Sequence, residues 1–300
     1  MKPTMRWLNN EVAYMAAPVN TGFLIKNGKA VIVDTGLDKD HAKKMLRLLE
    51  EEGITPIAII NTHSHADHCG GNAQLQKQLN LPVIAPALEK PFIEHPYLES
   101  LGLYGGAHPP AALQNKFLQA KPSKVQEVYT PEQGSVTFED FNIHLIPLPG
   151  HSMQQTGIFY AGILFSADVL LGKAYLDKHL IPFNADVNRH RRSLDMMREV
   201  SFELCVPAHG EPMDQAMALI DRNVEALDFI DHWILEHTKN PATIDQLLSA
   251  FCHDQSVGLD TISQYHLYRT AFSAHLAALS ENNRVKHLVE EALFLWKKVE

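Results

Sequence analysis

Six consecutive residues carry four side chains that can bind a transition metal. Residues 63–68 read His-Ser-His-Ala-Asp-His and follow a short apolar run. Alternate side chains of an extended segment point the same way, so His63, His65 and Asp67 can share one face. His68 then follows as a helix begins. Imidazole and carboxylate ligands without thiolate suit Zn(II), and they also accept Fe(II) or Mn(II). The spacing predicts a metal site.

Three further donor side chains follow strand-like segments later in the chain. His151 lies in Pro-Gly-His-Ser, Asp168 ends an apolar run, and His209 lies in Pro-Ala-His-Gly. Strand ends and the loops after them are where sheet-based folds present active groups. We therefore expect these three residues to join the cluster at residues 63–68, and most of the seventeen histidines to be ordinary surface or core residues.

The elements that position these residues alternate between strand and helix, which is typical of a layered α/β domain. Strands are predicted at residues 11–16, 22–26, 29–34 and 57–61. Asn27-Gly28 is a hairpin signal between two of them. Asp38 or Asp40 can cap the helix that ends at Gly53, and a second helix is expected at residues 73–79.

The rhythm breaks between residues 89 and 131, where six prolines interrupt the pattern. A long, poorly periodic segment inside a domain is usually a lid or a binding loop. Regular elements then resume, with a helix at residues 191–200 before the last strand. The expected strands span residues 136–138, 141–147, 156–160, 163–165 and 204–206.

The last part of the chain is predicted to be helical. Helices are expected at residues 213–236, 243–250 and 261–279, followed by a terminal hairpin, an order that resembles a winged-helix unit. Residues 222–300 hold seven Lys and Arg against eleven Asp and Glu, so the basic footprint of a nucleic-acid binder is missing. We therefore predict a catalytic domain at residues 1–212, with an insertion at about 89–131, and a helical winged-helix-like cap at residues 213–300 that could form a homodimer.

Composition restricts the function classes further. The chain has 300 residues, 45% of them hydrophobic, which is ample for a buried core. It shows no apolar signal core and no uncharged stretch long enough to cross a bilayer, so we expect a cytoplasmic protein without a membrane partner. Three scattered cysteines indicate reduced thiols. A net charge of −9 argues against a nucleic-acid partner and favours a small-molecule substrate.

The ordered donor series resembles the metallo-β-lactamase superfamily, in its glyoxalase II-like and lactamase-β2-like branches. The resemblance covers residues 1 to about 212, and the turn Asp34-Thr35-Gly36 and Thr62 match it as well. It implies an α/β fold built as a four-layer αββα sandwich, with a two-metal site at one edge and a winged-helix-like tail. Asp34 is expected to hold the ligand loop, because a metal-binding histidine needs a partner on its other nitrogen.

The same resemblance implies the ligand set. One ion is expected on His63, His65 and His151, a second on Asp67, His68 and His209, and Asp168 is expected to bridge them. Two divalent ions about 3.5 to 4 Å apart hold a bridging hydroxide and lower the pKa of water towards about 7. That hydroxide is the expected nucleophile. Asp67, or a metal-bound water, is expected to return a proton to the leaving group.

These features predict hydrolysis of a small ester-like bond in a lactone, thioester or phosphoester, with the insertion as one wall of the cleft. The chain departs from the glyoxalase II pattern after His151, and the basic residues that would bind glutathione cannot be placed by motif. Lys173, Tyr175 and His179 either face the cleft or are simple loop residues.

Three alternatives stay open. The first is a single-strand endoribonuclease of the lactamase-β2-like type, for which residues 189–192 are the densest positive cluster. The second is a mononuclear iron dioxygenase that acts on persulfides. The third, a metal-stabilised binding protein without turnover, is disfavoured because every ligand position is filled.

Overall fold

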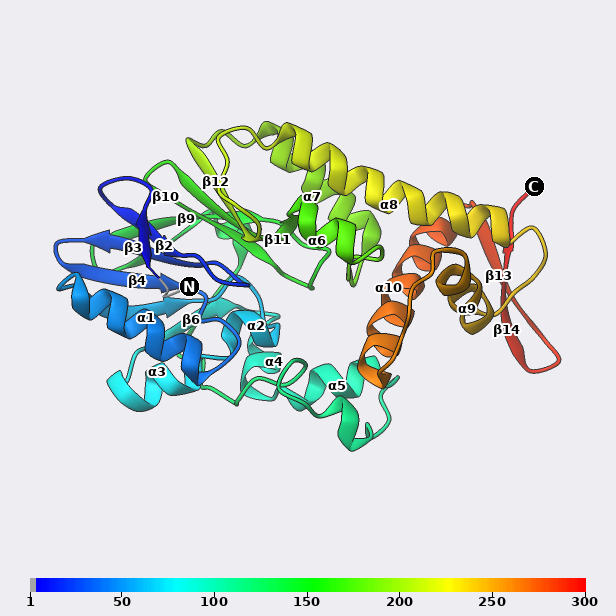
Figure 1. Ribbon diagram of the computed structural model, residues 1–300, viewed down its shortest axis with the longest axis horizontal. Helices are drawn as coiled ribbons and strands as arrows, with labels where there is room; N and C mark the ends of the chain where they lie inside the picture. The colour runs from blue at the N-terminus through cyan, green and yellow to red at the C-terminus, as the bar shows by residue number, and fades with distance from the viewer. Residues whose placement is uncertain (1–3) are drawn as a thin grey trace.

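Two β-sheets form the centre of the protein in the computed structural model, which describes residues 4–300 (Figure 1). The first sheet has seven strands in chain order: β1 (Met5–Trp7), β2 (Val12–Met15), β3 (Thr21–Lys26), β4 (Lys29–Val33), β5 (Thr55–Ile60), β6 (Val83–Pro86) and β7 (Glu127–Tyr129). The second sheet has five strands in the order β12 (Leu204–His209), β11 (Ile163–Leu171), β10 (Thr156–Tyr160), β9 (Phe141–Pro147) and β8 (Ser135–Phe138).

Helices cover the outer face of each sheet. The helices that follow strands of the first sheet are α1 (Lys39–Glu51), α2 (Ala66–Cys69), α3 (Asn72–Leu79), α4 (Lys90–Glu94) and α5 (Tyr97–Leu103), with the 3-10 turns Ala111–Leu113 and Pro131–Gln133 after them. Those that follow β11 and β12 are α6 (Lys173–Lys178), α7 (Val187–Glu199), α8 (Met217–His237), α9 (Ile244–Asp254) and α10 (Ile262–Glu281). The antiparallel hairpin β13 (Val285–Glu290) and β14 (Leu293–Lys298) ends the chain.

Three apolar clusters hold the layers together. The middle one joins the two sheets and includes Leu24 and Ile60 from the first and Phe165 from the second. The other two join each sheet to its helices, through residues such as Met45 of α1 and Leu194 of α7. Alternate residues of a strand face opposite sides of a sheet, so each sheet contributes to two clusters. The αββα sandwich predicted from the sequence is therefore confirmed.

Several local predictions are also confirmed. Asp38 caps α1, with its side chain accepting hydrogen bonds from the backbone N–H groups of Asp40 and His41. Asn27 and Gly28 form the two-residue turn between β3 and β4, and both have the positive φ that this turn requires. Residues far apart in sequence are brought to one edge because β4, β5 and β6 run parallel, so their carboxyl ends lie side by side.

Two predictions about local structure are wrong. Asp168 does not end a strand: β11 continues to Leu171, and a bulge with Ala167 at φ 50° turns the strand just before Asp168. The segment at residues 89–131 is not irregular throughout. It contains α4 and α5, and it ends in β7, whose Tyr129 is buried in the core between the sheets.

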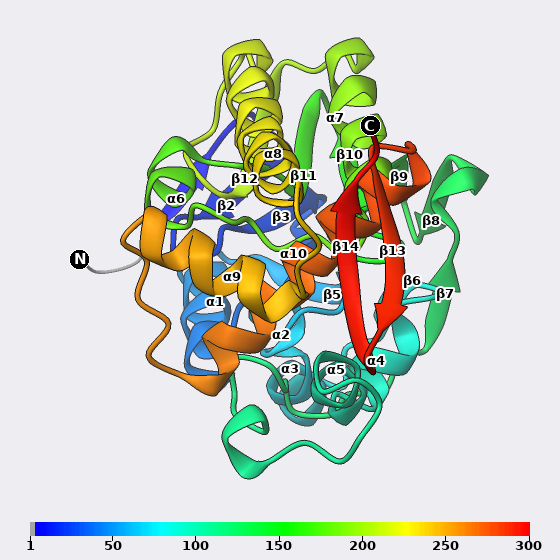
Figure 2. The ribbon, with the colours of Figure 1, turned by 90° about the vertical axis from the view of Figure 1, so that its right-hand side faces the viewer.

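The C-terminal unit, defined here as α8 to β14, extends to one side of the sandwich (Figure 1). Figure 2 shows α9, α10 and the hairpin lying in front of the two sheets. The order of three helices and a hairpin agrees with the sequence pattern. Helix α8 belongs to both units, because Ile220 and Leu227 pack on the second sheet whereas Ile230 and Trp233 pack among the C-terminal helices. The domain boundary at residue 212 stays a prediction. No helix among residues 4–300 has the length and apolar character needed to span a membrane.

Candidate metal centre

The seven donor residues predicted from the sequence meet at one edge of the sandwich. His63 follows β5, and His65 is the extended residue that precedes α2, which places Asp67 and His68 on that short helix. His151 lies in the turn between β9 and β10, Asp168 lies in β11, and His209 is the last residue of β12. Three overlapping groups have donor atoms within 4.8 Å of one another: His63, His65 and His151; His63, His68 and Asp168; and Asp67, His68 and His209.

The first group is a set of three imidazoles that face each other. His63 Nε2 lies 3.1 Å from His65 Nδ1, and His151 Nε2 lies 2.9 Å from the same atom. His65 Nδ1 is either a donor or an acceptor, so it cannot donate to one of these nitrogens and accept from the other at the same time. Three nitrogens converging in this way suit a shared cation, which accepts lone pairs from all of them.

Asp168 lies between the three imidazoles of the first group and the group of Asp67, His68 and His209. Its Oδ2 lies 3.3 Å from His151 Nε2 and 3.5 Å from His209 Nε2, and its Oδ1 lies 3.4 Å from His68 Nε2. Asp67 Oδ2 is 3.4 Å from His209 Nε2 on the far side. One carboxylate therefore faces histidines of both groups.

Two buried donor atoms at the centre lack a hydrogen-bond partner within the described part of the chain. They are His68 Nε2 and Asp168 Oδ1, which face each other. Leaving a buried polar atom unsatisfied costs about 1–3 kcal/mol, so such pairs call for an explanation. A metal ion between the donors removes the deficit, and the donor set of five imidazoles and two carboxylates fits a divalent transition metal.

Burial and neighbouring charges hold the groups of the centre in different protonation states. Burial lowers the pKa of His63 well below its ordinary value, and burial lowers that of His151 to about 3. Burial also lowers the pKa of His209, but the carboxylates of Asp168 and Asp67 outweigh burial and raise this pKa to about 10. Burial raises the pKa of Asp67, but the positive charge on His68 and His209 outweighs it and lowers the value to about 2. Neutral imidazoles and ionised carboxylates are the forms that bind metal, so His63, His151 and Asp67 are already in that form, whereas His209 would release a proton when a metal binds.

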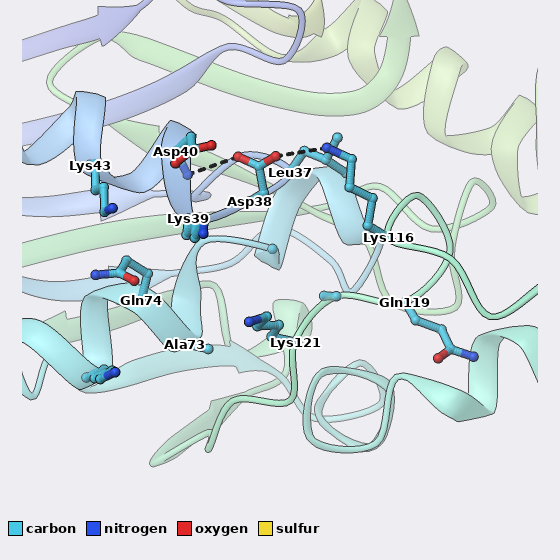
Figure 3. Close-up of a pocket in the computed structure, with 13 residues that line it drawn as sticks. Leu37, Asp38, Lys39, Asp40, Lys43, Ala73, Gln74, Lys116, Gln119 and Lys121 are labelled. Atoms are coloured by element: carbon cyan, nitrogen blue, oxygen red, sulfur yellow. Dashed lines mark hydrogen bonds and ion pairs between the residues drawn. The ribbon is translucent and has the colours of Figure 1, made fainter.

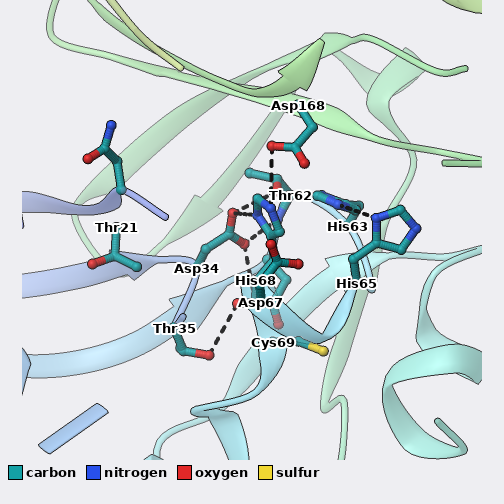
Figure 4. Close-up of polar contacts among 12 residues, drawn as sticks. Thr21, Asp34, Thr35, Thr62, His63, His65, Asp67, His68, Cys69 and Asp168 are labelled. Atoms are coloured by element: carbon teal, nitrogen blue, oxygen red, sulfur yellow. Dashed lines mark hydrogen bonds and ion pairs between the residues drawn. The ribbon is translucent and has the colours of Figure 1, made fainter. Parts of the chain in front are cut away.

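Asp34 anchors the loop that carries the donors (Figure 4). This buried carboxylate accepts hydrogen bonds from Thr62 N (2.9 Å) and Thr62 Oγ1 (2.7 Å), and it lies 2.8 Å from His68 Nδ1. It therefore fixes the ring of His68 with Nε2 facing Asp168, as the sequence predicted for a residue that positions the ligand loop.

Glu89 is a second anchor, which the sequence reasoning missed. It follows β6, is only 2% exposed, and joins two donor loops. Its Oε2 accepts from Ser64 N (3.2 Å) and Ser64 Oγ (2.5 Å), and its Oε1 accepts from Ser152 Oγ (2.8 Å) and Gln154 N (2.8 Å). The sequence signal that could have identified Glu89 was the short apolar run of β6, because the carboxyl end of this strand lies beside that of β5.

Replacing Glu89 by Gln is expected to weaken metal binding roughly 10–100-fold, because one acceptor oxygen becomes a donor facing two other donors. Metal titration against a competing chelator measures the effect. Glu50→Gln, on the exposed face of α1, serves as the matched control. Equal metal affinity in both variants would show that Glu89 does not position the donors.

The donors open into a small cavity of about 140 Å³. Five of the seven contribute to its lining, together with four apolar side chains: Phe117 and Leu118 from the insertion, Phe183 from the loop between α6 and α7, and Leu267 from α10. Two further polar contributors are Glu99 of α5, which the sequence reasoning missed, and Tyr175 of α6, one of the residues weighed for the cleft. The carboxyl group of Glu99 makes no hydrogen bond or ion pair with the residues described, and burial raises its pKa. Tyr175 lies with its ring centre 4.9 Å from that of His209.

The three loop residues expected near the cleft have different surroundings. Tyr175 lines the donor cavity, and the ring of His179 lies beside the Tyr175 ring at 4.6 Å. Lys173 is bound to Asp177 by an ion pair of 2.8 Å and lines a neighbouring hollow that also reaches His209. Of the three, the structure brings Tyr175 into the cavity itself.

Comparison with solved structures supports the fold. The chain superposes on a beta-lactamase domain protein from Burkholderia ambifaria with a TM-score of 0.75, 15% identity, and coverage of 98% of this chain and 94% of that chain. A metallo-beta-lactamase family protein from Thermus thermophilus gives a TM-score of 0.70 at 18% identity, with coverage of 99% and 97%.

Sequence comparison gives relatives of two kinds. A probable metallo-hydrolase of Bacillus subtilis, YqgX, is 27% identical over 168 residues, which are 55% of this chain and 72% of the relative. A hydroxyacylglutathione hydrolase of Xanthomonas campestris is 32% identical over 144 residues, 48% of this chain and 43% of the relative, so the match spans less than half of that enzyme.

A family model matches residues 15–209, which hold all seven donors and both anchors. This range also holds every strand of the two sheets except β1 and most of β2. The resemblance found in the sequence is thereby confirmed: the chain belongs to the metallo-beta-lactamase superfamily.

Proposed function

We propose that this protein is a metal-dependent hydrolase that binds two divalent ions and cleaves a small thioester or a related ester. Zn2+ is the preferred metal at both positions. The observation that carries the proposal is the position of Asp168, whose two oxygens face His68 on one side and His151 and His209 on the other. His63, His65 and His151 would hold one ion, and Asp67, His68 and His209 the other, with Asp168 shared. Fe or Mn would fit the same donors.

Bound ions of this kind supply a hydroxide at neutral pH and polarise the bond to be cleaved. The residues of the chain do the rest. The five donors that line the cavity place the reacting bond beside the centre, and the apolar residues around them exclude bulk water. Asp67 lines the cavity, and because its pKa is about 2 its carboxylate stays ionised; it can accept a hydrogen bond from water, and a water molecule can supply the proton that the leaving sulfur or oxygen takes up.

The lining of the cavity favours a small acyl group over a large polar one. Phe117 and Leu118 of the insertion and Leu267 of α10 contact the same space as the donors. Apolar side chains at a reaction centre bind hydrocarbon and do not pair with polar groups. Similarity to a hydroxyacylglutathione hydrolase supports a thioester as the bond that is cleaved.

Phe117→Ala is expected to raise KM for substrates with a long acyl chain about tenfold while metal content and thermal stability stay unchanged. The ring is 67% exposed, so its loss removes substrate contact rather than core packing. Steady-state kinetics on a series of acyl chain lengths tests this. Phe294→Ala, at a 49% exposed ring on the terminal hairpin, is the control. An equal effect on every chain length would contradict a role in acyl recognition.

A parallel assay of lactones, thioesters, phosphodiesters and short RNA, on protein of measured metal content, tests the function. Thioester or ester turnover that rises with two bound ions per chain is the expected result. One iron per chain with oxygen uptake on persulfides would identify the dioxygenase instead. Cleavage of RNA alone would identify the ribonuclease, although Arg191 of its proposed basic cluster is already paired with Asp228 and Asp231.

A further inference from the structure

A second cavity, of about 720 Å³, lies beside the first α-helix and is lined by five lysines (Figure 3). They come from three separate segments of the chain: Lys39 and Lys43 from α1, Lys77 from α3, and Lys116 and Lys121 from the insertion. Two carboxylates, of Asp38 and Asp40, are the acidic side chains of the lining. The cavity therefore carries a formal excess of three positive charges, in a chain whose net charge is −9. We call it the lysine groove.

Most of this positive charge is not neutralised by the protein itself. Lys116 pairs with Asp38 at 3.1 Å, but the side chains of Lys39, Lys43, Lys77 and Lys121 make no hydrogen bond or ion pair within residues 4–300. Asp38 is already engaged as the cap of α1, so it is not free to move towards the other lysines. Four unpaired ammonium groups around one hollow repel each other unless an anion lies between them.

Two segments of the chain contribute neighbouring residues to the lysine groove and to the donor cavity. In the insertion, Phe117 and Leu118 line the donor cavity, whereas Lys116, Gln119 and Lys121 line the groove. At α2, Asp67 lines the donor cavity and Gly70 lines the groove, a separation of about one helical turn, or ~5 Å. The two cavities therefore lie next to each other, separated by these two segments.

We propose that the lysine groove binds the phosphate groups of the substrate, which is a thioester whose thiol portion carries phosphates. This inference rests on the hydrolase function proposed above. Lysine ammonium groups bind phosphate as point charges from several directions, which suits an arrangement gathered from three segments. In the reaction, water adds to the acyl carbon and the carbon–sulfur bond breaks. The products are a carboxylic acid and the phosphate-bearing thiol.

The size of the groove favours a small phosphate ligand over RNA. A nucleic-acid site needs a basic track along the surface, and C-terminal residues 222–300 carry an acidic excess instead. The positive charge is confined to one hollow next to the donor cavity. A ligand with two or three phosphates at one end matches this distribution.

The test combines binding with kinetics on the full-length protein, using Lys43→Ala, Lys77→Ala and Lys121→Ala in one chain. These side chains are exposed and unpaired, so the fold should be retained. Calorimetry with ADP measures binding independently of turnover. Kinetics compare a coenzyme A thioester with the N-acetylcysteamine thioester of the same acyl group, which lacks phosphates. A control variant removes three lysines outside the groove: Lys124, Lys286 and Lys297.

We expect the groove variant to lose ADP binding and about tenfold in kcat/KM on the coenzyme A thioester, through KM, as three exposed charge contacts are lost. Turnover of the N-acetylcysteamine thioester should not change, and the control variant should match the wild type. Salt should weaken the wild-type preference. Equal rates on both thioesters in every variant, or tighter binding of a short RNA than of ADP, would overturn the proposal. Failure to cleave either thioester would instead contradict the proposed hydrolase.

Discussion

Asp168→Ala is expected to lower metal content and reduce kcat/KM by more than about 100-fold, because the variant loses the one carboxylate that faces both donor groups. Residues that merely orient metal ligands cost roughly 10–100-fold when changed, and a shared ligand should cost more. The positive charges on His68 and His209 also lose their common counterion. Elemental analysis of the purified protein, followed by kinetics at saturating metal, measures both effects.

The matched control is Asp195→Ala, which removes a carboxylate that is 76% exposed on α7. It should keep full metal content and full activity. Thermal unfolding of both variants separates loss of the site from loss of the fold. Unchanged turnover at full metal loading in the Asp168→Ala variant would show that Asp168 is not a shared ligand.

Asp34→Ala is expected to destabilise the metal-free protein by about 3 kcal/mol, the lower end of what breaking a buried charged pair costs. The change leaves Thr62 N and His68 Nδ1 without their partner in a site that is only 3% exposed. Alanine also fits poorly at φ 59°, a conformation that Asp and Asn tolerate better. Denaturant unfolding of chelator-treated protein gives the free energy directly.

Asp34→Asn separates the two roles of this residue. Asparagine tolerates the same backbone conformation and keeps one acceptor oxygen for Thr62, so most of the stability should return. It has no negative charge to hold His68, so metal affinity should stay low. If Asp34→Asn bound metal as tightly as the wild type, the orienting role of Asp34 would be refuted.

The part of this site that could be predicted from the sequence is the part encoded by local pattern. His63, His65, Asp67 and His68 lie within six consecutive residues, so their proximity needs no tertiary information. The cap at Asp38 and the turn at Asn27-Gly28 are local in the same way. The distant donors could be added because each lies at or near the end of a strand.

The remaining features depend on contacts between distant segments. The bulge that aims Asp168 requires a positive φ at an alanine, which no local signal marks. Glu89 acquires its role only because β6 pairs beside β5, and Leu267 reaches the cavity only because α10 folds back onto the insertion. The lysine groove joins side chains up to 82 residues apart, from Lys39 to Lys121, and sequence order alone does not bring them together.

Helix α8 has a consequence for how the substrate reaches the donors. Its first half is fixed to the second sheet and its second half to the C-terminal helices, with no linker between them. The two units are therefore coupled through one continuous helix. The insertion offers a more local change, because Gly105 and Gly106 both adopt positive φ before the chain reaches Phe117, which lines the cavity. We therefore expect opening of the cavity to start in this loop.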